Sequence, residues 1–175
     1  MAALSPLCLG FEQGPGTPPW RPAGPFSALP ATDKLPWMLD PDDTTTGSRG
    51  SILTVDDCAT TRALLSMLLE ALGYSVQAVD NGSDALEAAS RQAFDAIVLD
   101  VEMPGLDGMA VGRALRQNPR TARAKIAMHT GLDEDAVRAG FSGYDAFVPK
   151  AASPRLLCER VDGLVRSTRA AQPTT

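Results

Sequence analysis

The chain has 175 residues, which is room for one ordinary domain and some additional sequence. Hydrophobic residues make up 44% of it, enough for a core, whereas the net charge of −5 and the lack of a basic stripe argue against a nucleic-acid partner. The sequence contains no run of about 18 apolar residues and no basic leader, so it predicts neither a membrane span nor a signal peptide. Three widely spaced cysteines without a metal-ligand pattern indicate reduced thiols and a cytoplasmic location.

Residues 1–50 are rich in the two residue types that interrupt helices and strands. They hold 9 of the 14 prolines and 6 of the 15 glycines. We interpret this segment as a disordered extension. Two alternatives stay open, namely a docking motif at Trp37-Met38-Leu39 and a later start of the protein at Met38. At the other end, residues 169–175 are predicted to form a short polar tail.

Residues 51–168 alternate five times between a short apolar run and an amphipathic stretch. Five such units in a row predict a doubly wound α/β fold, with a parallel sheet, right-handed crossovers and helices on both faces. The predicted strands are 51–55, 75–79, 96–100, 124–130 and 144–148, and the predicted helices are 59–72, 83–91, 107–117, 133–139 and a last one that opens at Ser153-Pro154.

Two local signals support the helix assignments. Ser83 is a candidate N-cap for the second helix, because its hydroxyl can accept a bond from an unpaired amide of the first turn. The first helix is closed by Gly73 and carries leucines at helical spacing, which we expect to face the core. These leucines are Leu64, Leu65, Leu68, Leu69 and Leu72.

Polar residues stand where the predicted strands end. Asp56 and Asp57 follow the first strand, Asp100 ends the third, Thr130 ends the fourth and Lys150 follows the fifth. In an open parallel sheet these ends meet at one edge, which is where ligands bind. Each feature taken alone is commonly a turn or a helix cap, and the coincidence on four strands is what favours a functional site.

Three carboxylates at one edge repel one another. At an effective dielectric constant near 20, a pair about 4 Å apart costs roughly 4 kcal/mol, so either a proton or a cation must compensate. An all-oxygen cluster suits Mg2+, which readily binds phosphate oxygens as well. With Lys150 and Thr130 to stabilise an oxyanion and Asp100 as a carboxylate nucleophile, the set predicts phosphoryl transfer.

Four segments resemble the receiver domains of bacterial two-component response regulators. Residues 52–57 (Ile-Leu-Thr-Val-Asp-Asp) are similar to the start of such domains, and residues 100–108 (Asp-Val-Glu-Met-Pro-Gly-Leu-Asp-Gly) to their phosphoacceptor segment. Thr130-Gly131 resembles the switch threonine and its small neighbour, and residues 147–150 resemble the switch aromatic and lysine. The resemblance implies a flavodoxin-like three-layer sandwich with strand order 2-1-3-4-5.

The resemblance also implies a chemistry for the acidic residues. Asp100 would accept a phosphoryl group from a phosphohistidine on a sensor histidine kinase or a histidine phosphotransfer protein. Asp56, Asp57 and Asp100, with the backbone carbonyl of Glu102, would hold Mg2+. Such a chain is a phosphoacceptor signalling domain and not an enzyme, and it would act as a stand-alone receiver.

The resemblance further implies a switch. Lys150 and Thr130 would bind the phosphoryl oxygens, and the ring of Phe147 would fill the space that Thr130 leaves as it moves inward. The face formed by the fourth helix, the fifth strand and the fifth helix would then report the change to a downstream protein.

The sequence departs from the family pattern after the lysine, where Ala151 replaces a proline that follows a cis bond. A cis bond without proline costs roughly 2.5–4 kcal/mol, so we expect a trans bond and a displaced Lys150. A degenerate receiver that only binds partners is therefore one alternative. The other is a phosphatase that uses Asp100 as nucleophile and Glu102 as second acid, although Met103-Pro104 matches the receiver pattern instead.

Overall fold

The computed structural model describes residues 48–170, in which five strands alternate with five helices. The predicted extension, with its Trp37-Met38-Leu39 motif, lies outside the described residues apart from positions 48–50, and so does most of the predicted tail. No helix in the described range is long and apolar enough to cross a membrane. The strands are β1 (Ser51–Val55), β2 (Ser75–Val79), β3 (Ala96–Leu99), β4 (Lys125–Thr130) and β5 (Ala146–Pro149), and the helices are α1 (Ala59–Ala71), α2 (Gly82–Arg91), α3 (Gly108–Gln117), α4 (Glu134–Gly140) and α5 (Pro154–Ala170).

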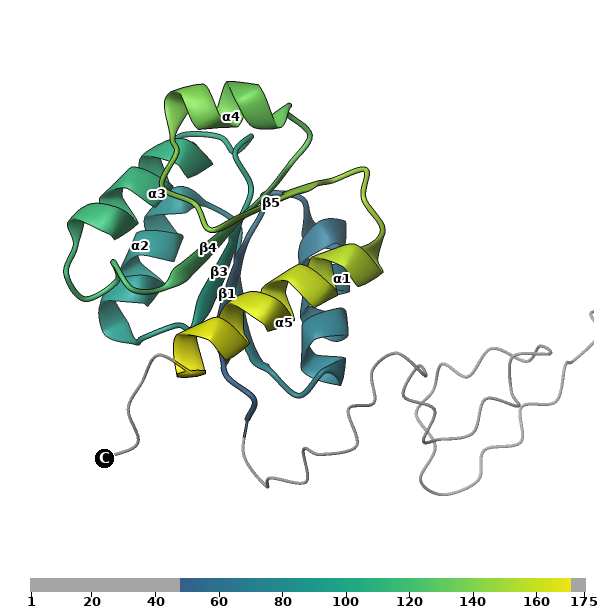
Figure 1. Cartoon of the computed structure of the whole chain (residues 1–175). Coiled ribbons are helices and arrows are strands. Elements are labelled where there is room, and N and C mark those ends of the chain that lie inside the picture. Colours follow the sequence, from purple (N-terminus) through teal and green to yellow (C-terminus); the bar gives the residue numbers. More distant parts are fainter. Residues whose placement is uncertain (1–47, 171–175) are drawn as a thin grey trace, which may run out of the picture. The chain divides into compact units, whose positions relative to one another are not determined.

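The five strands form one parallel sheet in the order β2-β1-β3-β4-β5. Helices α1 and α5 cover one face of the sheet, and α2, α3 and α4 lie on the other (Figure 1). The predicted doubly wound sandwich and its strand order are confirmed. The order of connection reverses between β1 and β3, which is the place where open α/β sheets bind ligands.

The centre of the sheet is apolar on both faces. All four residues of β3 are buried, and so are all but the first residue of β1 and of β4. Helices shield both faces of these strands, so continuous apolar runs replace the alternation of a half-exposed sheet. Each fully buried Val, Leu or Ile stabilises the fold by about 1.5–3 kcal/mol. The edge strand β2, in contrast, has no buried residue.

The leucine stripe of α1 is only partly buried. Leu65 and Leu69 are 3% and 0% exposed, whereas Leu64 is 40% exposed, so the prediction that all five leucines face the core is wrong. Consecutive helical residues are turned by about 100°, and a helix that lies on a sheet buries a stripe of about that width. Leu64 therefore falls outside the stripe that Leu65 and Leu69 define.

The second helix begins earlier than predicted. Asn81, and not Ser83, is its N-cap, because the Asn81 side-chain oxygen accepts a hydrogen bond from the Asp84 amide at 2.8 Å. The third helix starts in the same way, with the Asp107 carboxylate accepting from the Ala110 amide at 2.7 Å. Short Asn and Asp side chains satisfy first-turn amides that have no partner within the helix.

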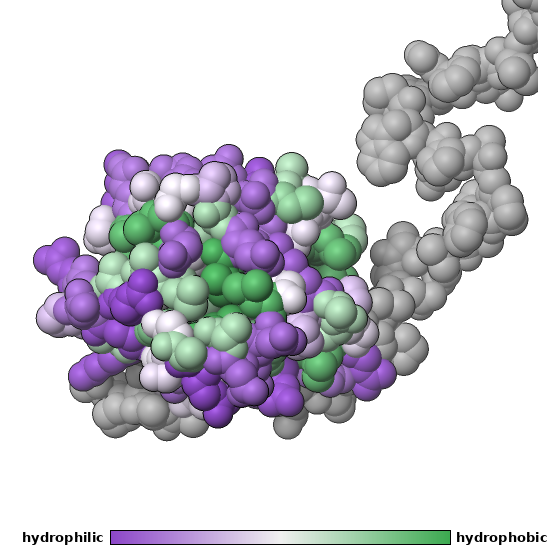
Figure 2. Space-filling view, turned by 90° about the horizontal axis from the view of Figure 1, so that it is seen from above, coloured by the Kyte–Doolittle hydropathy of each residue, from purple (hydrophilic) through white to green (hydrophobic). Residues whose placement is uncertain are grey.

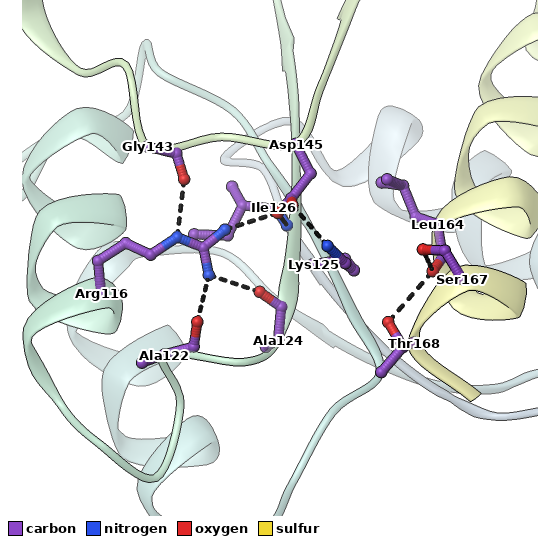
Figure 3. Close-up of polar contacts among 10 residues, drawn as sticks. All are labelled: Arg116, Ala122, Ala124, Lys125, Ile126, Gly143, Asp145, Leu164, Ser167 and Thr168. Atoms are coloured by element: carbon purple, nitrogen blue, oxygen red, sulfur yellow. Dashed lines mark hydrogen bonds and ion pairs between the residues drawn. The ribbon is translucent and has the colours of Figure 1, made fainter. Parts of the chain in front are cut away.

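The last strand begins two residues later than predicted, because Asp145 is held by a network before β5 starts (Figure 3). Its carboxylate accepts hydrogen bonds from Arg116 at 2.6 Å, from Lys125 at 2.8 Å and from the Ile126 amide at 2.9 Å. Arg116 also donates to three backbone carbonyls of the neighbouring loops, those of Ala122, Ala124 and Gly143. We call Arg116, Lys125 and Asp145 the Arg116 cluster.

The Arg116 cluster makes the free energy of unfolding of the domain depend on pH in the acidic range. Burial would raise the pKa of Asp145, but Lys125, the Ile126 amide and Arg116 stabilise its carboxylate and hold the pKa below its usual value. A carboxyl with a lowered folded pKa stabilises the fold above its unfolded pKa of about 4 and loses that contribution as the pH falls through the folded pKa. We expect Asp145→Asn to cost about 1–2 kcal/mol at pH 7 and much less once the pH has fallen below the folded pKa of Asp145. Urea unfolding of both proteins across this range checks it, and a constant difference would contradict it.

Candidate functional site

Three carboxylates meet at the edge of the sheet where the strands end. Asp56 and Asp57 follow β1, and Asp100 follows β3, which pairs with β1. One carboxylate oxygen of each residue lies within 4.8 Å of those of the other two. The structure therefore brings together the three acids that the sequence predicts at one site.

Two of the three acids are buried. Asp56 and Asp100 are each 1% exposed, whereas Asp57 is exposed to solvent. Asp100 accepts a hydrogen bond from the Glu102 amide at 3.1 Å, and Asp56 accepts one from the Cys58 amide at 2.9 Å. Each buried carboxylate keeps its second oxygen turned toward the ammonium group of Lys150.

Lys150 bridges the two buried acids. Its Nζ lies 2.7 Å from Asp100 Oδ2 and 2.9 Å from Asp56 Oδ2. Burial disfavours the ammonium form, but the hydrogen bond to Asp100 and the charge attraction of Asp100 and Asp56 outweigh burial and raise the pKa of Lys150. The lysine therefore stays charged and compensates part of the negative charge.

The expected displacement of Lys150 does not occur. The described residues contain no cis peptide bond, so the bond to Ala151 is trans, as the sequence predicts. The Lys150 amide nevertheless donates to the carbonyl of Thr130 at 2.8 Å and so continues the pairing of β5 with β4 for one more residue. This backbone bond fixes the lysine at the edge without help from the residue that follows it.

The other predicted site residues lie around the acids. Thr130 is fully buried at the end of β4, and its hydroxyl oxygen lies 3.4 Å from the Leu132 amide, which donates to it. The Glu102 side chain is exposed, and its carboxylate lies over Gly131, where an added Cβ would be 3.1 Å from Oε2. Phe147, in β5, is half-buried against the core.

One residue of the site was not predicted from the sequence. Arg62, in the first turns of α1, donates from Nη1 to the carbonyl of Asp56 at 2.8 Å and to that of Asp57 at 2.9 Å. It thus fixes the two peptide groups that carry the acid pair. A basic residue five positions after an acid pair is a weak signal, because its usual partners on a helix are other side chains.

The charges and donor atoms at this edge fit a divalent cation. The three carboxylates carry more negative charge than Lys150 compensates, and carboxylate repulsion at such distances is costly. Asp56 Oδ2 is the one buried side-chain oxygen of the described residues that accepts no hydrogen bond, because Lys150 approaches it closely but outside hydrogen-bond direction. Oxygen ligands with one open buried position suit Mg2+, which keeps several of its waters.

A family model for the response regulator receiver domain matches residues 52–162. The chain belongs to this family. The match contains all three acids together with Thr130 and Lys150. Members of the family are phosphoacceptor signalling domains of two-component systems, which take their phosphoryl group from histidine kinases and in general bind Mg2+ at an acidic site.

Curated relatives of this receiver are longer proteins. The transcriptional regulatory protein ResD of Bacillus subtilis is 41% identical over 117 residues, which cover 66% of this chain and 48% of ResD. The transcriptional activator PfeR of Pseudomonas aeruginosa is 35% identical over 118 residues and is covered to 38%. The chain therefore spans about half the length, or less, of the curated relatives it matches.

Solved structures of receivers share the fold. The signal receiver domain of a histidine kinase from Syntrophus aciditrophicus superposes with a TM-score of 0.65 at 32% identity, covering 72% of this chain and 97% of that domain. The response regulator TrrA of Thermotoga maritima, solved in complex with Mg(2+)-BeF, gives a TM-score of 0.60 at 32% identity and covers 65% of this chain and 97% of TrrA.

Proposed function

We propose that Asp100 of this receiver accepts a phosphoryl group from a phosphohistidine. A carboxylate oxygen of Asp100 forms the new P–O bond, the P–N bond to the histidine breaks, and the imidazole leaves with the electron pair and takes up a proton. The observation that carries the proposal is the position of Asp100, buried among two further carboxylates with Lys150 at 2.7 Å. The Lys150 ammonium compensates part of the repulsion between the carboxylates, and it can attract the oxygens of an incoming phosphoryl group.

Asp56, Asp57 and Asp100, with the backbone carbonyl of Glu102, would hold Mg2+. When bound, the ion neutralises charge that develops on the phosphoryl oxygens. Arg62 keeps the peptide groups of Asp56 and Asp57 in place for this task, as its two hydrogen bonds indicate.

Lys150 and Thr130 act on the phosphoryl group itself. The Lys150 ammonium bridges Asp56 and Asp100 in this structure. After phosphorylation it would form an ion pair with a phosphoryl oxygen. Thr130 would turn its hydroxyl, which accepts a long hydrogen bond of 3.4 Å from the Leu132 amide, toward a second oxygen. The space that Thr130 leaves would be filled by Phe147, a two-state repacking of the kind that phosphorylation switches use.

The phosphoryl donor and the downstream protein would bind two different surfaces of the domain. Figure 2 views the molecule from above, at the end where the strands terminate, and apolar surface lies in the middle of it with hydrophilic surface around. A surface of this make-up suits the sensor kinase or histidine phosphotransfer protein, which must reach Asp100 there. The downstream protein would bind the α4–β5–α5 face, where a cavity of about 530 Å³ is lined by residues that include Glu134, Arg138, Tyr144, Phe147 and Arg160.

The charge of the chain and the chemistry of phosphoryl transfer lead to two further proposals. The acidic charge supports a protein partner over nucleic acid, and the need for a kinase-borne phosphohistidine supports a cytoplasmic location. A degenerate receiver stays the alternative, on the ground of Ala151.

Replacing Asp100 by asparagine is expected to abolish phosphorylation. With acetyl phosphate and Mg2+, the wild-type protein should incorporate label and the Asp100→Asn variant none, because an amide lacks the nucleophilic carboxylate oxygen. Asp95→Asn, a change of the same kind at the opposite end of β3, is the matched control and should label like the wild type. Label that persists in Asp100→Asn would rule out the proposal. A wild type that neither labels nor binds Mg2+ in calorimetry would favour the degenerate receiver.

A further inference from the structure

The strand that leads into Lys150, β5, is short, and its pairing ends with the Lys150 amide donating to the Thr130 carbonyl at 2.8 Å and the Val148 carbonyl lying 3.0 Å from Nδ1 of His129. β5 is an edge strand of four residues, paired with β4 along one side only. Its last residue, Pro149, has no amide hydrogen to donate. A short edge strand of this kind is prone to slip unless other contacts fix it.

The Arg116 cluster fixes this strand at its beginning. The Asp145 amide donates to the Ile126 carbonyl at 2.8 Å, while the Asp145 carboxylate accepts from the Ile126 amide at 2.9 Å. Arg116 then ties Asp145 to α3 at 2.6 Å and binds the carbonyl of Gly143 at 2.7 Å (Figure 3). These backbone and side-chain hydrogen bonds together favour a single register of β5 against β4.

The cluster acts on Lys150 through the length of the strand. Asp145 and Lys150 are five positions apart, about 16 Å of extended chain. A slip of one residue would shift the lysine by about 3.3 Å and turn every side chain of the strand to the other face of the sheet. The contacts of Lys150 Nζ with Asp100 and Asp56, at 2.7 and 2.9 Å, would not survive such a shift.

We infer that Arg116 and Asp145 are positioning residues for the receiver reaction, which set the register of β5 and thereby hold Lys150 against Asp56 and Asp100. The inference rests on the proposed function of Asp100. The acids themselves follow β1 and β3, and within the described residues no hydrogen bond of Arg116 or Asp145 reaches them. Loosening the cluster should therefore release the lysine and leave the acids in place.

This role has a signature that a general loss of stability lacks. Released from its register, Lys150 no longer competes with a cation at Asp56, so Mg2+ binds more tightly. Phosphorylation of Asp100 slows at the same time, because the ammonium no longer meets the phosphoryl oxygens. A merely destabilised domain would bind Mg2+ more weakly and label more slowly.

The experiment compares the full chain with Asp145→Asn and Arg116→Met. Arg91→Met is the control, since the one side-chain partner of Arg91 among residues 48–170 is Glu87, on the surface of α2. Mg2+ affinity is measured by calorimetry and labelling by acetyl phosphate at a temperature where every variant is folded. We expect labelling about ten- to a hundredfold slower in both cluster variants, as for a reacting group misplaced by an ångström or more, and unchanged in the control. Mg2+ affinity should rise threefold or more, by about 0.7 kcal/mol at least.

A double mutant completes the test. Adding Asp145→Asn to Lys150→Met should slow labelling by less than about twofold, because the two residues act through the same ammonium group. Wild-type rates in the cluster variants, weaker Mg2+ binding in them, or an additive double mutant would each overturn the inference and leave phosphorylation of Asp100 intact. A wild type without label would overturn the proposed function and the inference with it.

Discussion

Replacing Lys150 by methionine is expected to tighten Mg2+ binding about ten- to a hundredfold, a difference of about 1.4–2.7 kcal/mol. The Lys150 ammonium lies 2.9 Å from Asp56 Oδ2 and 2.7 Å from Asp100 Oδ2, so it occupies the region that the cation needs. At an effective dielectric constant of 20, a unit charge about 5 Å from a divalent ion is repelled by roughly 7 kcal/mol, and partial solvent exposure of the lysine reduces this several-fold. Methionine removes the charge and keeps the volume.

The same substitution should slow phosphorylation of Asp100 about a hundredfold, because the developing charge on the phosphoryl oxygens loses its ammonium partner. Calorimetry with Mg2+ and labelling by acetyl phosphate measure the two effects. Arg123→Met is the matched control, since it removes one positive charge from an exposed residue between α3 and β4, at the far end of the sheet. If Lys150→Met weakened Mg2+ binding, the lysine would not be the competitor that the geometry indicates.

Replacing Gly108 by alanine is expected to destabilise the domain by about 3 kcal/mol or more and to lower its Tm by about 10 °C. Gly108 is the first residue of α3 and packs directly on the backbone of the phosphoacceptor. A Cβ on it would lie 1.9 Å from the carbonyl oxygen of Asp100 and 2.9 Å from Cα of Val101. Backbone atoms on both sides cannot give way as a flexible side chain could, so α3 and the Asp100 loop must separate.

Gly163→Ala is the matched control for this change. Gly163 lies within α5, and an added Cβ would meet no atom within 4 Å. Alanine there should stabilise the helix by about 0.5–1 kcal/mol, because glycine loses more backbone entropy on folding. Thermal unfolding of the two variants therefore should shift in opposite directions. An unchanged Tm in Gly108→Ala would mean that α3 does not rest on Asp100 as the structure has it.

The sheet and the acid cluster could be predicted from the sequence because both follow from local rules. Apolar runs that alternate with amphipathic stretches define a parallel sheet, and the edge at which such strands end is fixed once they are parallel. Asp56, Asp57 and Asp100 therefore had to meet, whatever the details of packing. Lys150 fell to the same edge by the same rule, although its expected displacement was wrong because the bond between its amide and Thr130 has no signature in sequence.

What the sequence did not reveal depends on contacts between distant segments. Arg62 binds carbonyls, which every residue has, so no pattern of side chains marks its partners. The Arg116 cluster joins residues 29 positions apart, and the chain shows only an arginine at a helix end and an acid before a strand. Leu64 could not be told apart from Leu65 and Leu69, because hydropathy does not show which leucines lie at the border of the buried face of a helix.

The proposed function requires that Asp100 forms an acyl phosphate within the acidic cluster. Reduction of the labelled protein with borohydride converts an aspartyl phosphate to homoserine, and mass spectrometry of its peptides locates the converted residue. We predict homoserine at position 100 alone, formed only when Mg2+ is present. Conversion at Asp56 or Asp57, or at position 100 without Mg2+, would contradict Mg2+-dependent phosphorylation of Asp100.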